Sequence, residues 1–420
     1  MPELNLTEGL KKCVRCGQCR FVCPIFEQEK DEASSPRGRI ALVKAMQEGK
    51  YQPSQDMLQK MYNCLLCKTC VSECPSGVLT DELILKSRAY LDQVMGTPWW
   101  KKTVFQGFLT RPALLHCCFG LMRLYQKTGL QSLLTKTRMI ELLPGDLPQA
   151  EKIMPVVSGI PARKMLPDRV PAKGLKKIKV AYFLGCASNL IYPEIPLAAV
   201  EVLSKLGFEV IISQELKCCG MPALAYGQER VTRDLALANI SILLEEGVEA
   251  VVSDCATCSS TLIAEYPRLF PEDSLEYTKA QALSHKAMDL TKFIVEKAGV
   301  PANLKEVNRT VTYHDPCHLI HCQKVSRQPR ELLRAIPGVS LKEAGNAAQC
   351  CGSAGSFSLA HYDLSMKILN KKISGLAATG ADTVATCCPT CMMQLNFGLK
   401  KNGVAGQTLH PVQILAEAME

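Results

Sequence analysis

The chain has 420 residues, a formal net charge of +9 and a hydrophobic fraction of 47%. This length suits two or three domains with cores of their own, and no run reaches the roughly 18 apolar residues of a membrane-spanning helix. No nucleic-acid-binding motif is visible, so we expect no nucleic-acid partner. Residues 1–12 contain no signal-peptide core, and the 22 cysteines fall in ligand-spaced groups. The sequence therefore favours metal ligation in the cytoplasm over the disulfides of a secreted protein.

The first 90 residues contain one cysteine motif twice. The pattern C-x2-C-x2-C-x3-C-P begins at Cys13 and again at Cys64. It is typical of two-cluster ferredoxins, in which the fourth cysteine of each motif ligates the other cluster. Zinc, which usually takes two C-x2-C pairs, fits this pattern poorly. We therefore predict a helical, ferredoxin-like domain over residues 1–90 with two cubane [4Fe–4S] clusters, one held by Cys13, Cys16, Cys19 and Cys74, the other by Cys64, Cys67, Cys70 and Cys23.

A short basic segment separates the two motifs. Ser35-Pro36-Arg37-Gly38-Arg39 precedes a helical run over residues 40–47, which we expect to pack between the cluster loops. Two interpretations of the arginines stay open. They either pair with the charge of the clusters, or they are solvated bases at a helix N-terminus.

Residues 91–175 form a connector without cluster ligands. It has no acidic residue from 93 to 140, but it is rich in aromatic and basic side chains, including Lys101, Lys102, Arg111 and Arg123. Such helices lie in a membrane interface, dock on an acidic partner subunit, or pack on the protein's own core. We expect His116, Cys117 and Cys118 to be core residues, because they lack ligand spacing. Residues 144–171 are proline-rich and predict an extended linker.

From residue 176 the pattern changes to alternating strands and helices. Strands are expected at 180–184, 207–212, 250–252, 311–313 and 383–385, and helices at 196–206, 229–246, 331–335 and 363–380. This alternation favours parallel sheets flanked by helices. The fold class we predict is α+β multidomain, with the helical domain followed by two repeated α/β domains at 176–300 and 301–420.

The C-terminal part is an internal duplication. A single cysteine, a Cys-Cys-Gly and a C-x2-C recur with offsets of 131 to 133 residues. The first copy contains Cys186, Cys218, Cys219, Cys255 and Cys258, and the second contains Cys317, Cys350, Cys351, Cys388 and Cys391. Most of these groups follow predicted strands, and ligands of open α/β sheets collect at the carboxyl ends of strands. Five thiolates exceed the four that zinc or one cubane takes, so the spacing indicates an unusual cluster.

These cysteines carry a resemblance to a known family. The repeat is similar to the cysteine-rich (CCG) domain of heterodisulfide reductases. The whole arrangement, except the connector, resembles the heterodisulfide reductase D subunit, glycolate oxidase iron–sulfur subunits and lactate-utilisation iron–sulfur proteins. The resemblance implies that each set of five cysteines holds a noncubane [4Fe–4S] cluster, giving one or two such clusters beside the cubanes. Cys387 is an alternative to Cys388. His314, Asp315, His318 and His321 flank Cys317 and either cap the ligand loop or shuttle protons.

The resemblance also implies a function. No G-x-G-x-x-G follows a strand, so we expect no flavin or nicotinamide in this chain and assign no catalytic residue. The chain is expected to transfer electrons for a partner, an FAD-containing 2-hydroxy acid (glycolate or lactate) dehydrogenase or an electron-transfer flavoprotein, to or from a quinone or another carrier. The alternatives are a heterodisulfide-reductase-like catalytic subunit, which reduces a disulfide at a noncubane cluster, and a non-redox zinc or scaffold protein. We expect a cytoplasmic protein, either free or peripheral on the inner face of the cytoplasmic membrane.

Overall fold

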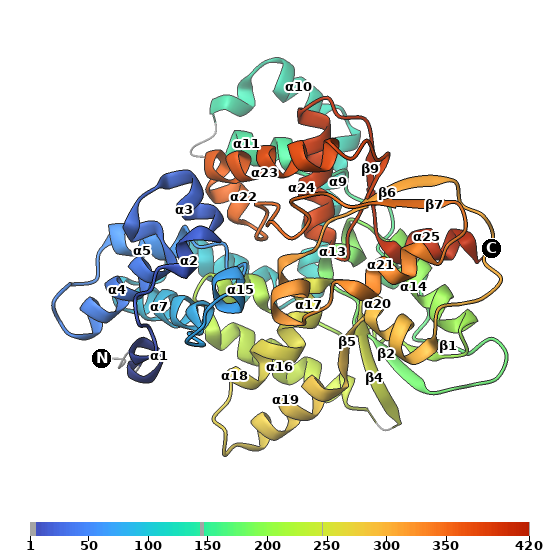
Figure 1. Ribbon diagram of the computed structural model, residues 1–420, viewed down its shortest axis with the longest axis horizontal. Coiled ribbons are helices and arrows are strands. Elements are labelled where there is room, and N and C mark those ends of the chain that lie inside the picture. Colours follow the sequence, from blue (N-terminus) through green and yellow to red (C-terminus); the bar gives the residue numbers. More distant parts are fainter. Residues whose placement is uncertain (1–5, 143–146, 246, 420) are drawn as a thin grey trace.

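The computed structural model describes residues 6–142, 147–245 and 247–419, and it contains a helical unit, a connector and two α/β units (Figure 1). Two of the described helices of the N-terminal unit begin at a proline, which suits the first helical position. Cys23 and Ser35 are the N-caps of these two, and each accepts a backbone hydrogen bond. The helices are α1 (Thr7–Lys11), α2 (Gln18–Phe21), α3 (Pro24–Glu29), η1 (Glu32–Ser34), α4 (Pro36–Gln47), α5 (Gln55–Tyr62), α6 (Thr69–Ser72) and α7 (Thr80–Met95).

The helix predicted between the two motifs is α4. Its buried face includes Ile40 and Val43, and it packs against α5 and α7. Its first turn carries Arg37 and Arg39, each of which lines one of the cysteine cavities described below. The prediction that residues 40–47 are helical is therefore confirmed, and Ile40 at the start of this run lines one of the two cavities.

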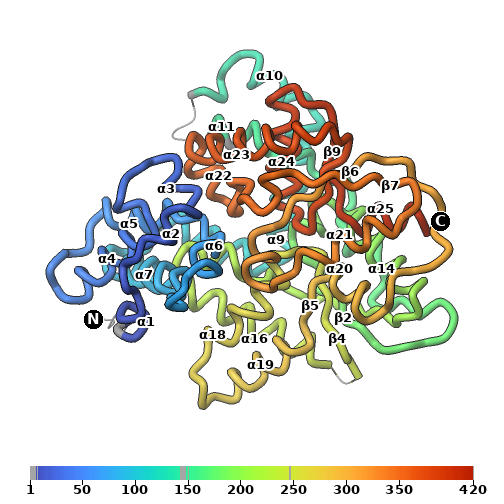
Figure 2. The backbone as a smooth tube through the Cα atoms, viewed as in Figure 1, coloured from blue at the N-terminus to red at the C-terminus, as the bar shows by residue number. Residues whose placement is uncertain are grey.

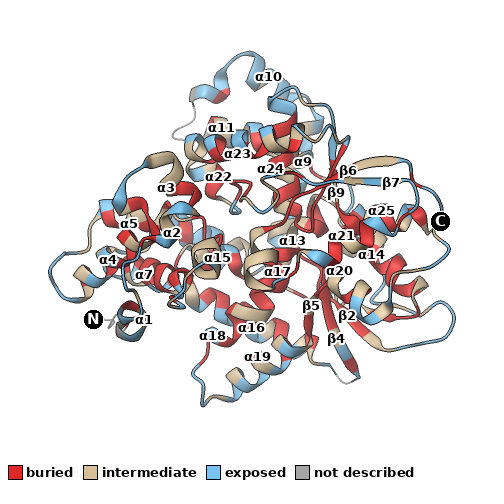
Figure 3. Cartoon of the chain, viewed as in Figure 1, coloured by how far each residue is buried: buried red, intermediate tan, exposed pale blue. Residues whose placement is uncertain are grey.

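The connector is helical and largely exposed. Its helices are α8 (Trp99–Lys101), η2 (Lys102–Phe108), α9 (Pro112–Lys127), α10 (Leu130–Lys136), η3 (Met139–Leu142), α11 (Leu147–Ile153) and α12 (Ala162–Met165). Neither α9 nor α10 has a buried residue, and both are coloured mainly as exposed or intermediate in Figure 3. The prediction of an extended linker over 144–171 is wrong for its described part, because α11 and α12 lie there; residues 143–146 fall outside the described residues.

The first α/β unit is built on a five-stranded sheet in the order β1-β3-β2-β4-β5. All neighbouring strands are parallel except β1, which comes from the end of the connector and pairs antiparallel with β3. The strands are β1 (Arg169–Val170), β2 (Lys179–Tyr182), β3 (Glu209–Ile211), β4 (Val248–Ser253) and β5 (Ala287–Asp289). The helices are α13 (Cys186–Leu190), α14 (Glu194–Lys205), α15 (Met221–Ala225), α16 (Glu229–Leu243), α17 (Ala256–Ser260), η4 (Thr261–Glu265), α18 (Tyr266–Arg268), α19 (Leu275–Lys286), α20 (Leu290–Phe293) and η5 (Ile294–Ala298).

The second α/β unit repeats the parallel part of this sheet. Its order is β7-β6-β8-β9, and all neighbours are parallel. The strands are β6 (Arg309–Tyr313), β7 (Val339–Lys342), β8 (Thr383–Ala385) and β9 (Gln407–Leu409). The helices are η6 (His318–Cys322), α21 (Arg327–Arg334), α22 (Phe357–Ala360), α23 (Tyr362–Ala377), α24 (Pro389–Lys401) and α25 (Pro411–Ala418). The duplication seen in the cysteines is therefore also a duplication of strand order.

The two α/β units face each other in a reciprocal way. The helix after the last strand of each unit packs against the first long helix of the other, so α25 contacts α14 and α20 contacts α21. Following the chain in Figure 2 shows the N-terminal unit at one side of this pair, next to both units. This arrangement brings the carboxyl ends of β4 and β8, and the cysteines after them, to the junction between the units.

Candidate metal centres

The first predicted cubane set lines one cavity. Cys13, Cys16, Cys19 and Cys74 line a void of about 370 Å³, which Cys70 lines as well. The loop turns at Gly17, whose φ of +88° favours glycine, and a Cβ there would lie 2.8 Å from the Arg37 guanidinium. Arg37 also lines this void and donates a hydrogen bond to the carbonyl of Arg15. A cation therefore stands beside a group of thiols that a metal cluster would make anionic.

The second predicted set lines a neighbouring cavity of about 440 Å³. Cys23, Cys64, Cys67 and Cys70 border it, so the fourth cysteine of the first motif does reach the second loop. Backbone N–H groups point at the sulfurs, since Phe26 donates to Cys23 at 3.5 Å and Leu66 donates to Cys64 at 3.5 Å. Such donors stabilise sulfur that carries negative charge.

The residues of both cavities fit an iron–sulfur cluster. Burial, followed by the neighbouring Cys317, raises the pKa of the Cys67 thiol to about 12, and burial also raises the pKa of Cys70 and Cys23. Thiolates packed this closely are unfavourable without a cation, and metal binding releases their protons. Arg39, which is 1% exposed, adds positive charge to the wall of the second cavity.

The first copy gathers its five cysteines at the carboxyl edge of its sheet. Cys186 begins α13 after β2, and Cys255 is the N-cap of α17 after β4. The sulfurs of Cys186 and Cys218 are 4.0 Å apart. Cys219 lies within hydrogen-bonding reach of Cys218 and Cys258, and Cys255 lies within reach of Cys258. The structure thus brings together all five residues predicted for this site.

The second copy gathers its five cysteines in the same way. Cys317 is the N-cap of η6 after β6, and Cys388 is the N-cap of α24 after β8. The sulfurs of Cys351 and Cys391 are 3.5 Å apart. Cys350 lies within reach of both Cys317 and Cys351, and Cys388 lies within reach of Cys391. Each copy therefore offers five convergent thiols, which is more than a zinc ion takes.

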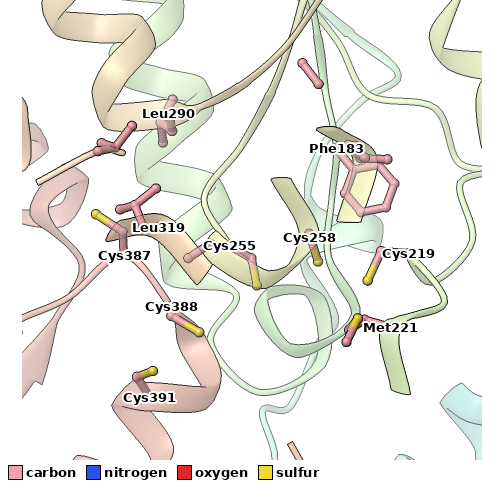
Figure 4. Packing of buried hydrophobic residues seen from close by; sticks show 14 of the residues in the cluster. Phe183, Cys219, Met221, Cys255, Cys258, Leu290, Leu319, Cys387, Cys388 and Cys391 are labelled. Carbon is pink, nitrogen blue, oxygen red and sulfur yellow. The ribbon is translucent and has the colours of Figure 1, made fainter. Parts of the chain in front are cut away.

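The two groups of five meet at the junction of the α/β units. Cys255 and Cys388 lie within hydrogen-bonding reach of each other, and the backbone N–H of Ala256 donates to the carbonyl of Cys387 at 2.9 Å. In Figure 4 the sulfurs of Cys219, Cys258, Cys255, Cys388 and Cys391 form a row across this junction. The thiols of the two copies are therefore continuous.

Cys387 lies outside this row. Its side chain is turned away from the neighbouring thiols in Figure 4, and it is fully buried. The Tyr313 hydroxyl donates to its sulfur at 3.4 Å, and Thr291 lies 3.8 Å away. Of the two adjacent cysteines left open by the sequence, the geometry favours Cys388 as the ligand.

The second copy also contacts the second cubane cavity. A buried apolar cluster joins Cys23, Ile25, Leu65 and Cys67 of the N-terminal unit to Cys350, Phe357 and Ile368 of the second copy, with Cys317 packed against it. Cys67 lies close enough to Cys317 and Cys350 for a charge on one thiol to raise the pKa of another. Two candidate centres far apart in sequence are thus neighbours in space.

The residues that flank Cys317 differ in their surroundings. His314 is buried beside Cys351 and Cys391, with one ligand atom from each residue within 4.8 Å of the others. Burial lowers the pKa of His314 to about 3, and its Nδ1 lies 3.3 Å from the carbonyl of Ala347. The other three flanking residues lie elsewhere. Asp315 accepts two hydrogen bonds from Arg330, and a ring nitrogen of His318 lies 3.3 Å from the hydroxyl of Thr257. His321 is half-buried. Only His314 among them lies in a group of ligand atoms that fits a metal ion, within the described residues.

Sequence reasoning missed a buried ionic network beside the second cubane cavity. Lys68, next to Cys67, pairs with Asp81 at 3.0 Å and with Glu265 of the first copy, and Arg268 pairs with Asp81 at 3.1 Å. Burial opposes the charge of Lys68, but Glu265 and Asp81 outweigh it and raise its pKa. A lysine inside a ligand loop was visible in the sequence, whereas nothing pointed to Glu265, 197 residues away.

Two further buried cations were also missed. The guanidinium of Arg88 donates to the carbonyls of Met61, Cys64 and Ala225, which ties the second cluster loop to the first copy. The ammonium of Lys372 donates to the carbonyls of Asn346 and Ala347 at 2.6 and 2.9 Å, next to the loop that carries Cys350. Burial lowers the pKa of Lys372 to about 8. Both residues stand on helices with ordinary amphipathic patterns, so their position in the chain gave no signal.

The connector differs from expectation in two respects. Cys117 is exposed and His116 and Cys118 are half-buried, so the prediction that they are core residues is wrong. Lys101 is 4% exposed and pairs with Asp92, so it does not belong to the exposed basic face. The helix α9 lies on the surface of the first copy instead of inside a core, which explains the first of these differences. Among the helices formed by residues 6–142, 147–245 and 247–419, none combines the length and apolarity needed to span a bilayer.

Comparisons with protein families cover most of the chain. A "4Fe-4S dicluster domain" matches residues 9–78, and a "Cysteine-rich domain" (CCG) matches residues 180–263 and 311–396. The linker region of the glycolate oxidase iron-sulfur subunit matches residues 96–154. We expected the resemblance to exclude the connector, and this last match shows that it extends there.

Individual relatives match over nearly the whole length. The chain is 33% identical to the "Probable glycolate oxidase iron-sulfur subunit" of Bacillus subtilis, over 99% of this chain and 95% of that protein. It is 28% identical to the glycolate oxidase iron-sulfur subunit of Escherichia coli, over 98% and 94%. It is 26% identical to the heterodisulfide reductase D subunit of Methanosarcina mazei, over 98% and 94%.

One solved structure shares the fold. A hypothetical protein from Helicobacter pylori aligns with a TM-score of 0.56 and 12% identity, over 98% of this chain and 72% of that chain. The sequence matches, the paired cysteine cavities and the duplicated CCG sites agree with one another. The chain belongs to the family of CCG-domain iron–sulfur proteins that includes the glycolate oxidase iron-sulfur subunits.

Proposed function

We propose that this chain is the iron–sulfur electron-transfer subunit of a flavin-dependent 2-hydroxy acid dehydrogenase or oxidase. The FAD and the oxidation of the substrate, glycolate or lactate, belong to a partner subunit. The names and full-length similarity of the Bacillus subtilis and Escherichia coli relatives support the partner and substrate class. The electrons leave to a quinone or another carrier.

The observation that carries the proposal is the continuity of the candidate ligands. Cys70 lines both cubane cavities, Cys67 neighbours Cys317 and Cys350, and Cys388 meets Cys255. We assign cubane ligands to Cys13, Cys16, Cys19 and Cys74, and to Cys23, Cys64, Cys67 and Cys70. We assign noncubane ligands to the two sets of five. When bound, [4Fe–4S] clusters accept and release single electrons.

The contacts between these groups of cysteines imply an order in which electrons pass from one candidate site to the next. The second copy adjoins the N-terminal unit through the apolar cluster, whereas the first copy meets the second copy across Cys255 and Cys388. The two cubane sites therefore lie at one end of the electron path, and the site of the first copy lies at the other end. The N-terminal unit is the side on which we expect the flavoprotein partner to dock, because its first cavity contains Cys16, an exposed ligand.

The test is anaerobic purification of the chain with its partners from the native host. We expect a flavoprotein to copurify and about 16 irons per chain, the content of four [4Fe–4S] clusters. Addition of glycolate or lactate should then bleach the iron–sulfur absorbance. Recovery of about eight irons with equimolar zinc would contradict the assignment of the CCG sites.

The similarity to the heterodisulfide reductase D subunit supports a second candidate, in which the CCG sites reduce a disulfide. The contact between the two sets of thiols at Cys255 and Cys388 is compatible with it. Disulfide-dependent oxidation of the reduced protein, without a response to 2-hydroxy acids, would favour this candidate over the first.

A further inference from the structure

A cleft lies between the connector and the first copy. Its empty space, counted together with the open solvent at its mouth, is about 340 Å³. The connector contributes Leu109, Leu115 and His116, while Cys186 and Cys218 lie in the opposite wall. Cys186 is only half-buried, although the other four cysteines of the first copy are buried. The cleft therefore gives a small molecule direct access to the edge of this candidate centre.

The chemistry of the walls limits what the cleft can bind. Most of the lining is apolar, with leucines from both the connector and the first copy. The polar side chains among the described lining residues are His116, Arg163, Asn189 and Lys217, and none of them is acidic. The buried Nε of Arg163 has no hydrogen-bond partner among the described residues. Such a site suits an apolar ring with carbonyl oxygens that accept hydrogen bonds.

One of these donors is oriented by a short chain of contacts. The Asn189 side-chain oxygen accepts from the backbone N–H of Arg163 at 2.8 Å, so its NH₂ group faces His116 Nε2 at 3.2 Å. Nε2 then accepts, and the proton of the neutral imidazole lies on Nδ1. Burial, with help from Arg163 and Lys164, lowers the pKa of His116, which keeps this neutral form at pH 7. His116 can therefore offer Nδ1–H to a ligand oxygen.

The surface beside the cleft is apolar and basic. Leu114, Leu121 and Leu124 of α9 are 39%, 62% and 58% exposed, and Arg111 at the start of α9 is exposed. This combination is typical of helices that lie in a membrane interface. A lipid-soluble ligand would reach the cleft from that side without crossing bulk water.

We propose that this cleft binds the head group of a lipid-soluble quinone, with its ring between Leu115 and Leu184 and its carbonyl oxygens facing His116 and Arg163. This proposal rests on the proposed function and names the acceptor and its site. Reduction of the quinone to a quinol takes two electrons and two protons. The electrons originate in the 2-hydroxy acid oxidised by the partner, and the protons come from water at the open mouth of the cleft.

The test is photoaffinity labelling of the anaerobically purified, cluster-loaded chain with an azido derivative of decyl-ubiquinone. We expect the label in peptides that contain residues 109–116 or 184–190, and we expect excess decyl-ubiquinone to prevent it. Leu115→Trp fills the cleft and should lower labelling at least tenfold. Leu133→Trp places the same ring on α10, at an exposed position outside the lining, and should leave labelling unchanged.

A second variant guards against an effect of misfolding. His116→Phe keeps a ring at this position but removes the donor, and it should lower labelling severalfold; iron content is measured for every variant. Labelling outside the cleft, or labelling of Leu115→Trp at full iron content equal to that of the wild type, would overturn the proposal. So would protection by a small disulfide but not by decyl-ubiquinone. Reduction of a soluble dye by the wild-type complex with its 2-hydroxy acid tests the proposed function separately.

Discussion

The two CCG copies have the same strand order and the same five cysteine positions, but they have different surroundings. Cys186 of the first copy lines an open cleft, although it is half-buried, as Cys317 is. Its counterpart, Cys317, packs against an apolar cluster shared with the N-terminal unit. The comparison teaches that duplication supplied two similar sets of five cysteines, while contacts outside the duplicated scaffold gave the second set an inner position and the first set an outer one.

The contacts of the N-terminal unit differ between the copies as well. Next to the cysteines, it meets the first copy through the ionic network of Lys68, Asp81 and Glu265, and it meets the second copy through apolar side chains such as Ile25 and Ile368. The ion pair of Lys371 with Glu27 also joins it to the second copy, but these two side chains are 49% and 36% exposed. An apolar contact leaves the neighbouring thiols close together without intervening charge. This difference agrees with the second copy as the neighbour of the paired cysteine cavities in the N-terminal unit.

The largest effect, a loss of iron, is expected from one of the adjacent cysteines Cys387 and Cys388 of the second copy. Cys388→Ala removes a thiol at the junction and should lower the iron content by about four per chain, the content of one cluster. Cys387→Ala is the matched control, because its sulfur faces Tyr313 and Thr291 instead of the row of thiols. Anaerobic iron and acid-labile sulfide analysis provides the measurement. Equal losses in both variants would mean that the two sulfurs share the ligand role.

The ionic contact with the first copy should be strongly stabilising. Lys68→Met leaves Asp81 and Glu265 buried with less compensation, and loss of one partner of a buried pair costs about 3–5 kcal/mol. Lys60→Met breaks a pair whose lysine side chain is 32% exposed and should cost only about 0–1 kcal/mol. Urea unfolding followed by circular dichroism measures the difference. A shift no larger for Lys68→Met than for Lys60→Met would show that the network contributes little.

The apolar contact with the second copy should be sensitive to truncation. Ile368 is 1% exposed in the cluster that includes Cys67 and Cys350, so Ile368→Ala should destabilise the protein by about 2–5 kcal/mol. Leu275→Ala, at a side chain that is 63% exposed, should change stability by no more than about 0.5 kcal/mol. The same urea series measures both variants. Similar midpoints for the two would contradict a packed interface at this position.

The smallest effect is expected at the connector, next to the first copy, and it concerns binding to anionic lipid. Lys102 and Arg111 are exposed, and each base near anionic lipid contributes about 1 kcal/mol, so changing both to Gln should weaken liposome binding on the order of 30-fold. Lys101 is left unchanged because it is buried against Asp92. The control replaces exposed Lys173 and Lys279, which removes the same charge elsewhere.

Co-sedimentation with anionic liposomes and pull-down of the flavoprotein partner are measured side by side. Loss of lipid binding with partner binding retained is the expected result. The opposite pattern would make the connector a subunit interface, and no change in either would make it a solvated face. Salt should weaken the lipid interaction, because exposed charges are screened over about 10 Å at 0.1 M.

The sequence by itself determined the local features of this protein. The spacing of Cys13 to Cys23, and of Cys64 to Cys74, defines loops whose thiols converge, and the strand predicted at 180–184 is seen as β2. The repeated offsets of the cysteines also indicated the duplicated sheets. Such features are readable because ligand loops and strands depend on residues close together in the chain.

Only the tertiary structure decided how these units face one another. It placed Cys67 beside Cys317, Lys68 beside Glu265, and His116 beside Asn189. Each pair joins surfaces whose complementarity comes from many residues distributed along the chain, so no local pattern encodes it. The choice between Cys387 and Cys388 was open for the same reason, since the direction of a side chain at a strand end is set by what packs against it.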